Sequence, residues 1–445
     1  MKMPEFNGPA KGADRRLMGA GVAAFLLVAF CLGYALSHRE EQTLTIGVFA
    51  GSNWNVPQGE TYAVIDAAVQ KFSAQHPGMN VVFESGIKRE DYGEWLAEQY
   101  LQGTEPDVFF LLEEDFNLYA SMGALMDLSD AMDGDTDFNT DNYYPAALRC
   151  GVYDEKSFAL PVENNVTLMF VNKTLLSREN IGMPAGDWTW QDFLDVCRKV
   201  TKDTDGDGVL DQFGCYDYSW EQAAVSNGAR LFREDGQACY FADGRMEETI
   251  RFMMELQALN RGMRPSARDF DTGRVAFRPF TFAQYRAYKP YPWRIKKYSS
   301  FEWDCATMPV GPHGDNVSVC QTLLLGMSAR TQKQNMAWDF MKLLCYDREI
   351  QRLILQKSQA LPSRRDVVLS AEAAEIFHWD AEESAVTPPN LDATMLNAVM
   401  PYRFPQYRAA MLYADAEITK IIDGVTPRMN ALNKLQKEIN AVLQR

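Results

Sequence analysis

The chain has 445 residues, enough for two or three compact domains. Hydrophobic residues make up 47% of it and aromatic residues 12%, a composition that excludes an intrinsically disordered chain. The formal net charge of -16 would repel a phosphate backbone, which argues against nucleic-acid binding and favours a neutral or cationic ligand.

The first predicted element is a hydrophobic N-terminal segment. Leu17 to Leu36 carries no charge and, at about 1.5 Å per residue, is long enough to cross a hydrocarbon layer of about 30 Å. Basic residues precede this segment, whereas two glutamates follow Arg39, so the positive-inside rule places the lead 1–16 in the cytoplasm. We therefore expect a transmembrane anchor over 17–37 and a chain exported to the outer face of the cell membrane.

A cleavable signal segment is the alternative for the same residues. Ala35 and Ser37 place small side chains at the two positions that a signal peptidase reads. Cleavage would release a secreted or periplasmic protein. The polar lead, and an uncharged run longer than the roughly 7–15 residues of a signal peptide, favour the anchor. A third interpretation, a helix packed inside a domain, has no comparably apolar partner downstream.

Alternating strands and helices follow the hydrophobic segment. Leu44 to Phe49 alternates as a strand does and stops at a Gly-Ser loop. Four more elements with helical or strand spacing follow at 64–72, 80–84, 95–101 and 108–112. Strand-helix-strand order at this spacing predicts a mostly parallel α/β sheet, whose ligands bind beyond the carboxyl ends of the strands. This edge points to the loops 52–55 and 113–115.

The later part of the chain continues the α/β pattern. We expect strands over 166–171 and 322–327, helical segments between 189 and 265, and a helix over 336–344. Thr189 and Asp192 predict a capping box at the start of an amphipathic helix whose apolar stripe is typical of core packing. Thr426 as N-cap and Pro427 after it predict the start of the final helix.

The cysteine pattern indicates neither a disulfide framework nor a zinc site. Of eight, Cys31 lies in the hydrophobic segment, and the others are widely spaced without any CxxC pair. This pattern argues against disulfides and against a zinc site, and favours buried free thiols.

An aspartate-rich loop is the sharpest local motif. It matches an EF-hand-like calcium loop through loop position 9, with Gly208 at the sharp turn. The expected ligands are Asp203, Asp205, Asp207, the backbone carbonyl of Val209 and Asp211. Gly214 stands where a bidentate glutamate is usual, so a structural Ca2+ would need another ligand, water or a lower coordination number. A solvated Asp-Gly turn without an ion is the alternative.

Catalytic motifs are scarce. The chain has only four histidines and no GxSxG, HExxH or Walker A sequence, so we expect no enzyme and no organic cofactor. A glycosidase that works with paired carboxylates stays an alternative, because Glu113, Glu114 and Glu163 lie near predicted strand ends. Aromatic residues recur in expected loops, where flat rings and neighbouring polar groups suit a carbohydrate.

The order of several segments resembles the family of extracellular solute-binding proteins, group 1, which includes maltose-binding protein. The resemblance covers nearly the whole exported chain. It rests on segments that follow in the family's order: 105–111, 160–163, 168–173, 188–193, 273–277, 308–312, 337–341 and 361–364. The resemblance implies a type II periplasmic-binding-protein fold with two α/β lobes and hinge strands near Pro161 and Met308.

The resemblance also implies the lobe boundaries and the ligand residues. One lobe would comprise 43–161 and 305–350, and the other 162–304 and 351–445. The implied ligand contacts are two carboxylates, a pair in the loop after the first strand and three rings for stacking: Glu114, Glu163, Asn53, Trp54, Trp220, Tyr285 and Tyr402.

The function implied is the solute-binding component of an ABC importer. Such a protein binds a sugar or oligosaccharide without chemical turnover and docks, here as an expected monomer, on ABC permease subunits in the membrane. A retained anchor would raise its effective concentration near the permease. A binding module that reports to a membrane sensor kinase is the alternative from another class.

Overall fold

The computed structural model of the chain describes residues 42–57, 62–288, 301–377, 386–428 and 430–444. The hydrophobic segment predicted over 17–37, with its Cys31, lies outside these residues. Within the described ranges, none of the helices combines the length and the apolar character that a membrane crossing requires.

The first sheet has six strands in the order β12-β6-β11-β3-β1-β2. They are β1 Gln42–Gly47, β2 Met79–Val82, β3 Val108–Leu111, β6 Ala159–Asn165, β11 Gln321–Met327 and β12 Leu361–Pro362. β1 pairs in parallel with β2 and β3, as predicted. β11 runs antiparallel to β3 and β6, so the prediction of a mostly parallel sheet is wrong beyond the third strand. The chain reaches β11 from the other sheet and not through a βαβ crossover, which alone would impose the parallel direction.

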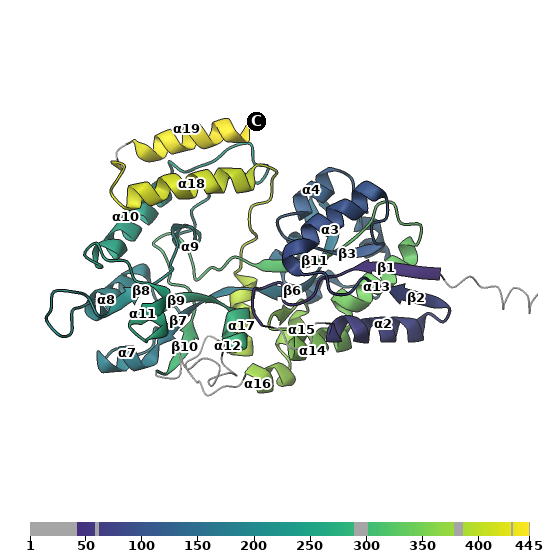
Figure 1. The fold of residues 1–445 in the computed structure, drawn as a ribbon, viewed down its shortest axis with the longest axis horizontal. Helices are drawn as coiled ribbons and strands as arrows, with labels where there is room; N and C mark the ends of the chain where they lie inside the picture. Colours follow the sequence, from purple (N-terminus) through teal and green to yellow (C-terminus); the bar gives the residue numbers. More distant parts are fainter. Residues whose placement is uncertain (1–41, 58–61, 289–300, 378–385, 429, 445) are drawn as a thin grey trace, which may run out of the picture.

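Helices cover both faces of this sheet, and together they form the first lobe (Figure 1). All four residues of β3 are buried, which a strand achieves only when both faces of its sheet are covered. The covering helices are α2 Ala63–Gln75, α3 Arg89–Gln102, α13 Gln334–Tyr346 and α14 Arg348–Lys357. One continuous hydrophobic core joins them to the strands.

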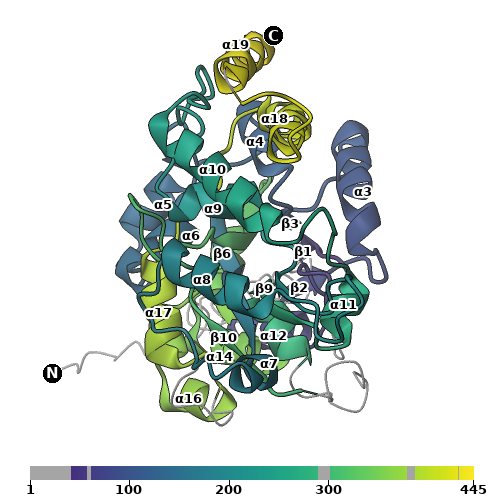
Figure 2. The ribbon, with the colours of Figure 1, turned by 90° about the vertical axis from the view of Figure 1, so that its left-hand side faces the viewer.

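The second sheet has four strands in the order β10-β7-β9-β8. They are β7 Thr167–Asn172, β8 Phe213–Cys215, β9 Val275–Thr281 and β10 Trp303–Ala306. The main helices beside it are α8 Trp190–Val200, α10 Gly244–Ala258, α18 Tyr407–Ile422 and α19 Ala431–Leu443. Sheet and helices share a separate core and form the second lobe, so the prediction of two α/β lobes is confirmed (Figures 1 and 2).

Two helix predictions of the second lobe have different outcomes. The capping box of Thr189 and Asp192 is present at the start of α8, whose predicted apolar stripe is buried. The final helix α19, in contrast, starts at Ala431 and not after Thr426. Asn430 precedes it with φ 65°, a left-handed conformation that interrupts a helix begun further upstream.

Short elements fill the remaining described chain. The short helices are α4 Phe116–Ser121, α5 Ser129–Gly134, η1 Thr140–Asn142, α6 Pro145–Arg149, α7 Lys173–Arg178, α9 Trp220–Ser226, α11 Ala267–Asp271, α12 Phe282–Tyr288, α15 Arg365–Val368, α16 Ala371–Phe377 and α17 Pro388–Leu396. A two-stranded hairpin joins β4 Val152–Tyr153 to β5 Lys156–Ser157. The seven cysteines of the described residues are free and buried, as predicted.

The chain passes between the lobes in the described residues at three places. It crosses at Val166 between β6 and β7, again between β10 and β11, and a third time between α17 and α18. A third core cluster, which includes Tyr144, Val166 and Leu361, lies where these passages meet. Such narrow connections between two compact bodies are the places where hinge motion occurs.

The lobe boundaries differ from those implied by the resemblance. Pro161 pairs with Leu324 inside the first sheet, so the first crossing lies at Val166 and not near Pro161. β10 pairs with β7 in the second sheet, although residues from 305 onward were assigned to the first lobe. β12 pairs with β6 of the first sheet, and α14 packs on α2, although residues from 351 onward were assigned to the second lobe. Strand pairing decides to which lobe each segment belongs, and the order of segments along the sequence does not reveal which strands pair.

Candidate ligand-binding cleft

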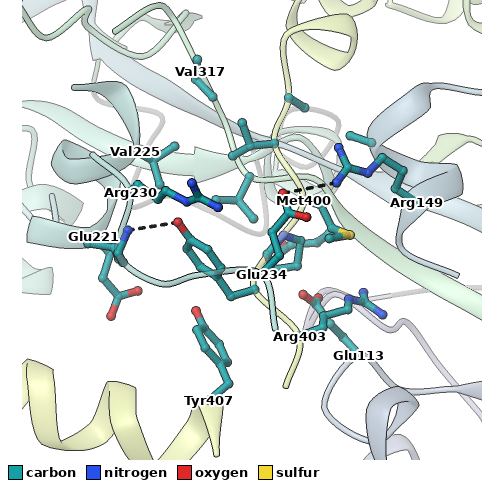
Figure 3. A pocket seen from close by; sticks show the side chains of 18 of the residues that line it. Glu113, Arg149, Glu221, Val225, Arg230, Glu234, Val317, Met400, Arg403 and Tyr407 are labelled. Atoms are coloured by element: carbon teal, nitrogen blue, oxygen red, sulfur yellow. Dashed lines mark hydrogen bonds and ion pairs between the residues drawn. The ribbon is translucent and has the colours of Figure 1, made fainter. Parts of the chain in front are cut away.

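A cleft of about 1430 Å³ lies between the two lobes (Figure 3). The first lobe contributes Glu113, Arg149 and Tyr153, and the second contributes Glu221 and Arg230 among others. The floor consists of two of the segments that cross between the lobes, because residues from 317 to 321 and from 396 to 407 also line the cleft. Both lobes and two of the segments that connect them therefore line the cleft, so a relative motion of the lobes would change its shape.

The two floor segments are tied together by backbone hydrogen bonds. The amide of Cys320 donates to the carbonyl of Val399 (2.9 Å), and the amide of Val399 donates to the carbonyl of Ser318 (2.9 Å). This short parallel pairing of Val319 with Val399 holds the two connecting segments next to each other.

Tyr402 is the one predicted ligand residue that lines the cleft. Its hydroxyl accepts a hydrogen bond from the Leu231 amide (3.0 Å), and its ring packs edge to face on Phe232 at 5.4 Å. These contacts fix the ring against the second lobe. Two rings not predicted as ligand residues, Tyr153 and Tyr407, line the cleft as well.

Two other predicted rings are core residues. Trp220 is 3% exposed and its indole Nε1 donates to Asp415 Oδ1 (3.0 Å). The capping box of Ser219 and Gln222 sets the start of α9 and directs Trp220, the first helical residue, inward. Tyr285 is also 3% exposed and packs edge to face on Trp303 at 5.6 Å. Neither ring lines the cleft.

Trp54 and Glu163 form a buried contact outside the cleft. The Trp54 Nε1 donates to Glu163 Oε1 (2.8 Å), and the Ser358 hydroxyl donates to Glu163 Oε2. Burial raises the pKa of Glu163, and the two donors offset only part of this effect. The Trp54 ring packs with Val56 against Ala283 of α12, so the loop after β1 contacts the segment that follows β9.

Asn53 and Glu114 both contact Arg89 at the start of α3. The Asn53 side-chain oxygen accepts from Arg89 Nε (3.0 Å), and Glu114 forms an ion pair with Arg89 Nη2 (3.5 Å). Neither lines the cleft, whereas Glu113, the neighbour of Glu114, does. The loop 113–115 thus presents Glu113 to the cleft and not the predicted Glu114, because the turn after β3 decides which side chain faces the cleft.

Some charged groups of the cleft form ion pairs or hydrogen bonds, and others form none with the described residues. Arg149 of the first lobe forms an ion pair with Glu234 of the second (3.8 Å), which links the lobes across the cleft. Arg403 Nη1 donates to the Cys150 carbonyl (2.7 Å), and its guanidinium carbon lies 5.2 Å from the centre of the Phe116 ring. Glu113 and Glu221 have neither a hydrogen bond nor an ion pair with any described residue.

Burial raises the pKa of both unpartnered carboxylates. For Glu113 the attraction of Arg403 offsets part of the effect, and for Glu221 the negative charge of Asp415 adds to it. The pKa of the Tyr407 hydroxyl is raised as well, first by burial and then by the charges of Glu221 and Glu113. In the view of Figure 3 the Tyr407 side chain lies between those of Glu221 and Glu113.

The aspartate-rich loop lies apart from the cleft, between α8 and β8. Carboxylate oxygens of Asp203, Asp205 and Asp211 lie within 4.8 Å of one another, a donor set that suits a hard cation such as Ca2+. Asp207 is not part of this group, and its Oδ1 accepts from the Val209 amide (2.7 Å). The residues present thus fit a cation with three of the four predicted carboxylates.

Known proteins share the family profile and the fold of this chain. The sequence profile described as "Bacterial extracellular solute-binding protein" matches residues 56–345. No curated protein matches the chain.

Among solved structures, the chain is similar to the cyclic α-maltosyl-1,6-maltose binding protein of Arthrobacter globiformis (18% identity, 90% of this chain and 99% of that chain, TM-score 0.73). It is similar to the sugar-binding protein MalE of Xanthomonas citri (16% identity, 91% and 98%, TM-score 0.73). It is also similar to an ABC substrate-binding protein of Listeria monocytogenes in complex with cycloalternan (20% identity, 91% and 99%, TM-score 0.66). These likenesses establish the two-lobed fold of periplasmic binding proteins.

Proposed function

Because the chain belongs to the family of bacterial extracellular solute-binding proteins, we propose that it binds a sugar or oligosaccharide between its lobes and delivers it to an ABC importer. The observation that carries this proposal is the cleft of about 1430 Å³, walled by both lobes and floored by their connections. A ligand that contacts both walls stabilises the closed arrangement over the open one.

The chemistry of the lining supports a carbohydrate. Tyr153, Tyr402 and Tyr407 offer ring surfaces, and carboxylates, amides and hydroxyls stand among them. The volume exceeds the roughly 300–1,000 Å³ of a site for a drug-sized molecule, which favours an oligosaccharide over a monosaccharide. Two of the similar solved proteins are described as a cyclic maltosyl-maltose binding protein and as a complex with cycloalternan.

We propose binding without chemical turnover. The described residues that line the cleft include no histidine and no cysteine, so a reaction there would depend on carboxylates alone. The similar solved proteins are described as binding proteins.

The site of action follows from the family. We propose an extracytoplasmic protein that the N-terminal segment tethers to the membrane and that docks, as a monomer, on the permease subunits of an importer. Membrane tethering would keep the binder close to its permease and so raise the rate of encounter.

Thermal unfolding against a panel of mono- and oligosaccharides tests the proposal. A ligand at 100 times its dissociation constant adds about 2.7 kcal/mol to the free energy of unfolding, which is readily visible as a higher melting temperature. The purified full chain is used, in a detergent without a sugar headgroup. A saccharide-specific shift without release of products supports the proposal, whereas cleavage of the saccharide contradicts it.

A further inference from the structure

The cleft carries an excess of negative charge. Six carboxylates line it, against three guanidinium groups and no lysine among the described residues. Two of the guanidinium groups already have a partner: Arg149 forms an ion pair with Glu234 (3.8 Å), and Arg230 Nε donates to the Phe232 carbonyl (3.3 Å). A ligand in the cleft therefore meets a negative potential, which the net charge of -16 reinforces.

Arg403, the third guanidinium, offers no group to an anionic ligand. Its Nη1 donates to the Cys150 carbonyl. Its Nε and Nη2 atoms are buried by surrounding protein atoms and have no hydrogen-bond partner among the described residues. Because these donors are covered, a carboxylate or phosphate in the cleft could not contact them in this arrangement.

Glu113 and Glu221, in contrast, face the cleft without partners and come from opposite lobes. Glu113 follows β3 of the first lobe, and Glu221 lies in the first turn of α9 in the second (Figure 3). Both are only partly exposed. Burial disfavours the charge on both carboxylates, and the attraction of Arg403 offsets this only in part for Glu113, so both gain from a cation that enters the cleft.

Tyr407 completes this arrangement from the start of α18. Its ring lines the same cleft, and its side chain lies between those of Glu113 and Glu221 in the view of Figure 3. An ammonium ion is attracted to the face of a tyrosine ring and donates up to three hydrogen bonds, which two carboxylates can accept. A neutral hydroxyl would leave the two negative charges uncompensated.

We propose that the cleft takes a saccharide that carries a protonated amine, an amino sugar, whose ammonium group lies between Glu113, Glu221 and Tyr407. This inference rests on the proposed function and names its ligand class. Lobe closure would bring the two carboxylates, one from each wall, onto the same ammonium group.

Matched ligand pairs test the inference on the unaltered full chain, in a detergent without a sugar headgroup. Each pair differs only in amines in place of hydroxyls. One amine distinguishes glucosamine from glucose and trehalosamine from trehalose, and three distinguish the chitosan trisaccharide from cellotriose. Isothermal titration calorimetry at pH 7 is expected to show the amine member of at least one pair binding about tenfold more tightly, the effect of a hydrogen bond to a charged group. Raising the salt concentration should reduce this preference. N-acetylation of the preferred ligand, which removes its charge, should abolish it.

Three variants assign the preference to the two carboxylates. Glu113→Gln and Glu221→Gln keep the side-chain shape and are each expected to lose most of the tenfold preference. Glu247→Gln is the control: it removes the same charge from the second lobe, at an exposed carboxylate that does not line the cleft. Glu247→Gln should keep the preference.

The outcomes separate the two proposals. A neutral partner that binds as tightly as its amine, or a preference that persists in both Glu113→Gln and Glu221→Gln, overturns the amino-sugar inference and leaves carbohydrate binding standing. No binding of any saccharide, with or without binding of spermidine as a cation that is not a sugar, overturns the proposed function and this inference with it. The ligand pairs give their answer on the wild-type chain even where a variant fails to fold.

Discussion

At the scale of single residues, the hydrogen bond from Trp54 to Glu163 should stabilise the first lobe, to which both residues belong. Trp54→Phe keeps an aromatic ring but leaves the buried Glu163 Oε1 without its donor. The loss of one partner of a buried charged group should lower the free energy of unfolding by about 1–3 kcal/mol, measured by urea titration. Trp95→Phe is the control, because Trp95 donates to Glu84 at an exposed position (3.1 Å). Equal effects of both substitutions would contradict a special role for the buried pair.

Glu163 also predicts a pH dependence of stability. Burial raises its folded-state pKa above the ordinary value of 4.5, so the folded protein holds this proton over a range where the unfolded chain has lost it. The stabilising contribution of the protonated Glu163 is therefore complete below the pKa that this residue has in the unfolded chain. The contribution is lost as the pH rises through the pKa of Glu163 in the folded protein. Glu163→Gln should be more stable than the wild type at pH 7, and the difference should shrink toward pH 4. A difference that does not change with pH in urea titrations would refute this assignment.

Single residues also show the limits of the sequence. Trp220 and Tyr285 stand beside polar neighbours in expected loops. A ring that stacks on a ligand and a ring that packs in the core can both occur in this sequence pattern. Only the tertiary structure buries them, Trp220 through the helix start at Ser219 and Tyr285 through its contact with Trp303. Glu163, predicted as a ligand contact, accepts instead from Trp54 Nε1 and does not line the cleft.

At the scale of elements, the loop between α8 and β8 should bind Ca2+. The carboxylates of Asp203, Asp205 and Asp211 converge, and a bound cation would remove the repulsion that hydrogen bonds to Asp203 and Asp211 only reduce. Saturating Ca2+, at 100 times the dissociation constant, should add about 2.7 kcal/mol to the free energy of unfolding, and a chelator should remove this gain. Differential scanning calorimetry would detect the shift in melting temperature. Identical melting curves with Ca2+ and with chelator would sink the proposal.

Two substitutions distinguish this cation site from the full EF-hand pattern. Asp203→Asn should abolish the Ca2+ effect, because Asp203 belongs to the group of three. Asp207→Asn should keep most of it, because the Asp207 carboxylate stands outside the group. The sequence pattern alone treats both positions as equal ligands, and only the backbone path of the loop separates them.

Elements defined by local signals were predictable, and those defined by distant partners were not. The capping box of α8 depends on residues three apart, and the structure contains it as predicted. The direction of β11 depends on β3 and β6, which lie more than 150 residues earlier in the chain. The start of α19 depends on the left-handed conformation of Asn430, which the residues Thr426 and Pro427 do not predict.

At the scale of the whole molecule, ligand binding should bring the lobes together. α4 of the first lobe and α18 of the second lie on opposite sides of the gap between the lobes in Figure 1. Leu118 on α4 and Leu412 on α18 are 57% and 66% exposed, so cysteines there would accept spin labels without disturbing a core. The seven cysteines of the described residues are buried and should not react, and Cys31 is replaced by serine.

Electron-electron double resonance on Leu118→Cys/Leu412→Cys should show a shorter distance between the labels once the ligand is present, because a ligand held by both walls favours the closed arrangement. The control pair Val209→Cys/Leu412→Cys lies within the second lobe, and its distance should stay constant. A ligand that binds without shortening the first distance would contradict hinge closure while leaving the binding function intact. Since Glu113 and Glu221 come from opposite lobes, the shortening should also be smaller in Glu221→Gln when the ligand is an amino sugar, which ties the motion of the lobes to the charge in the cleft.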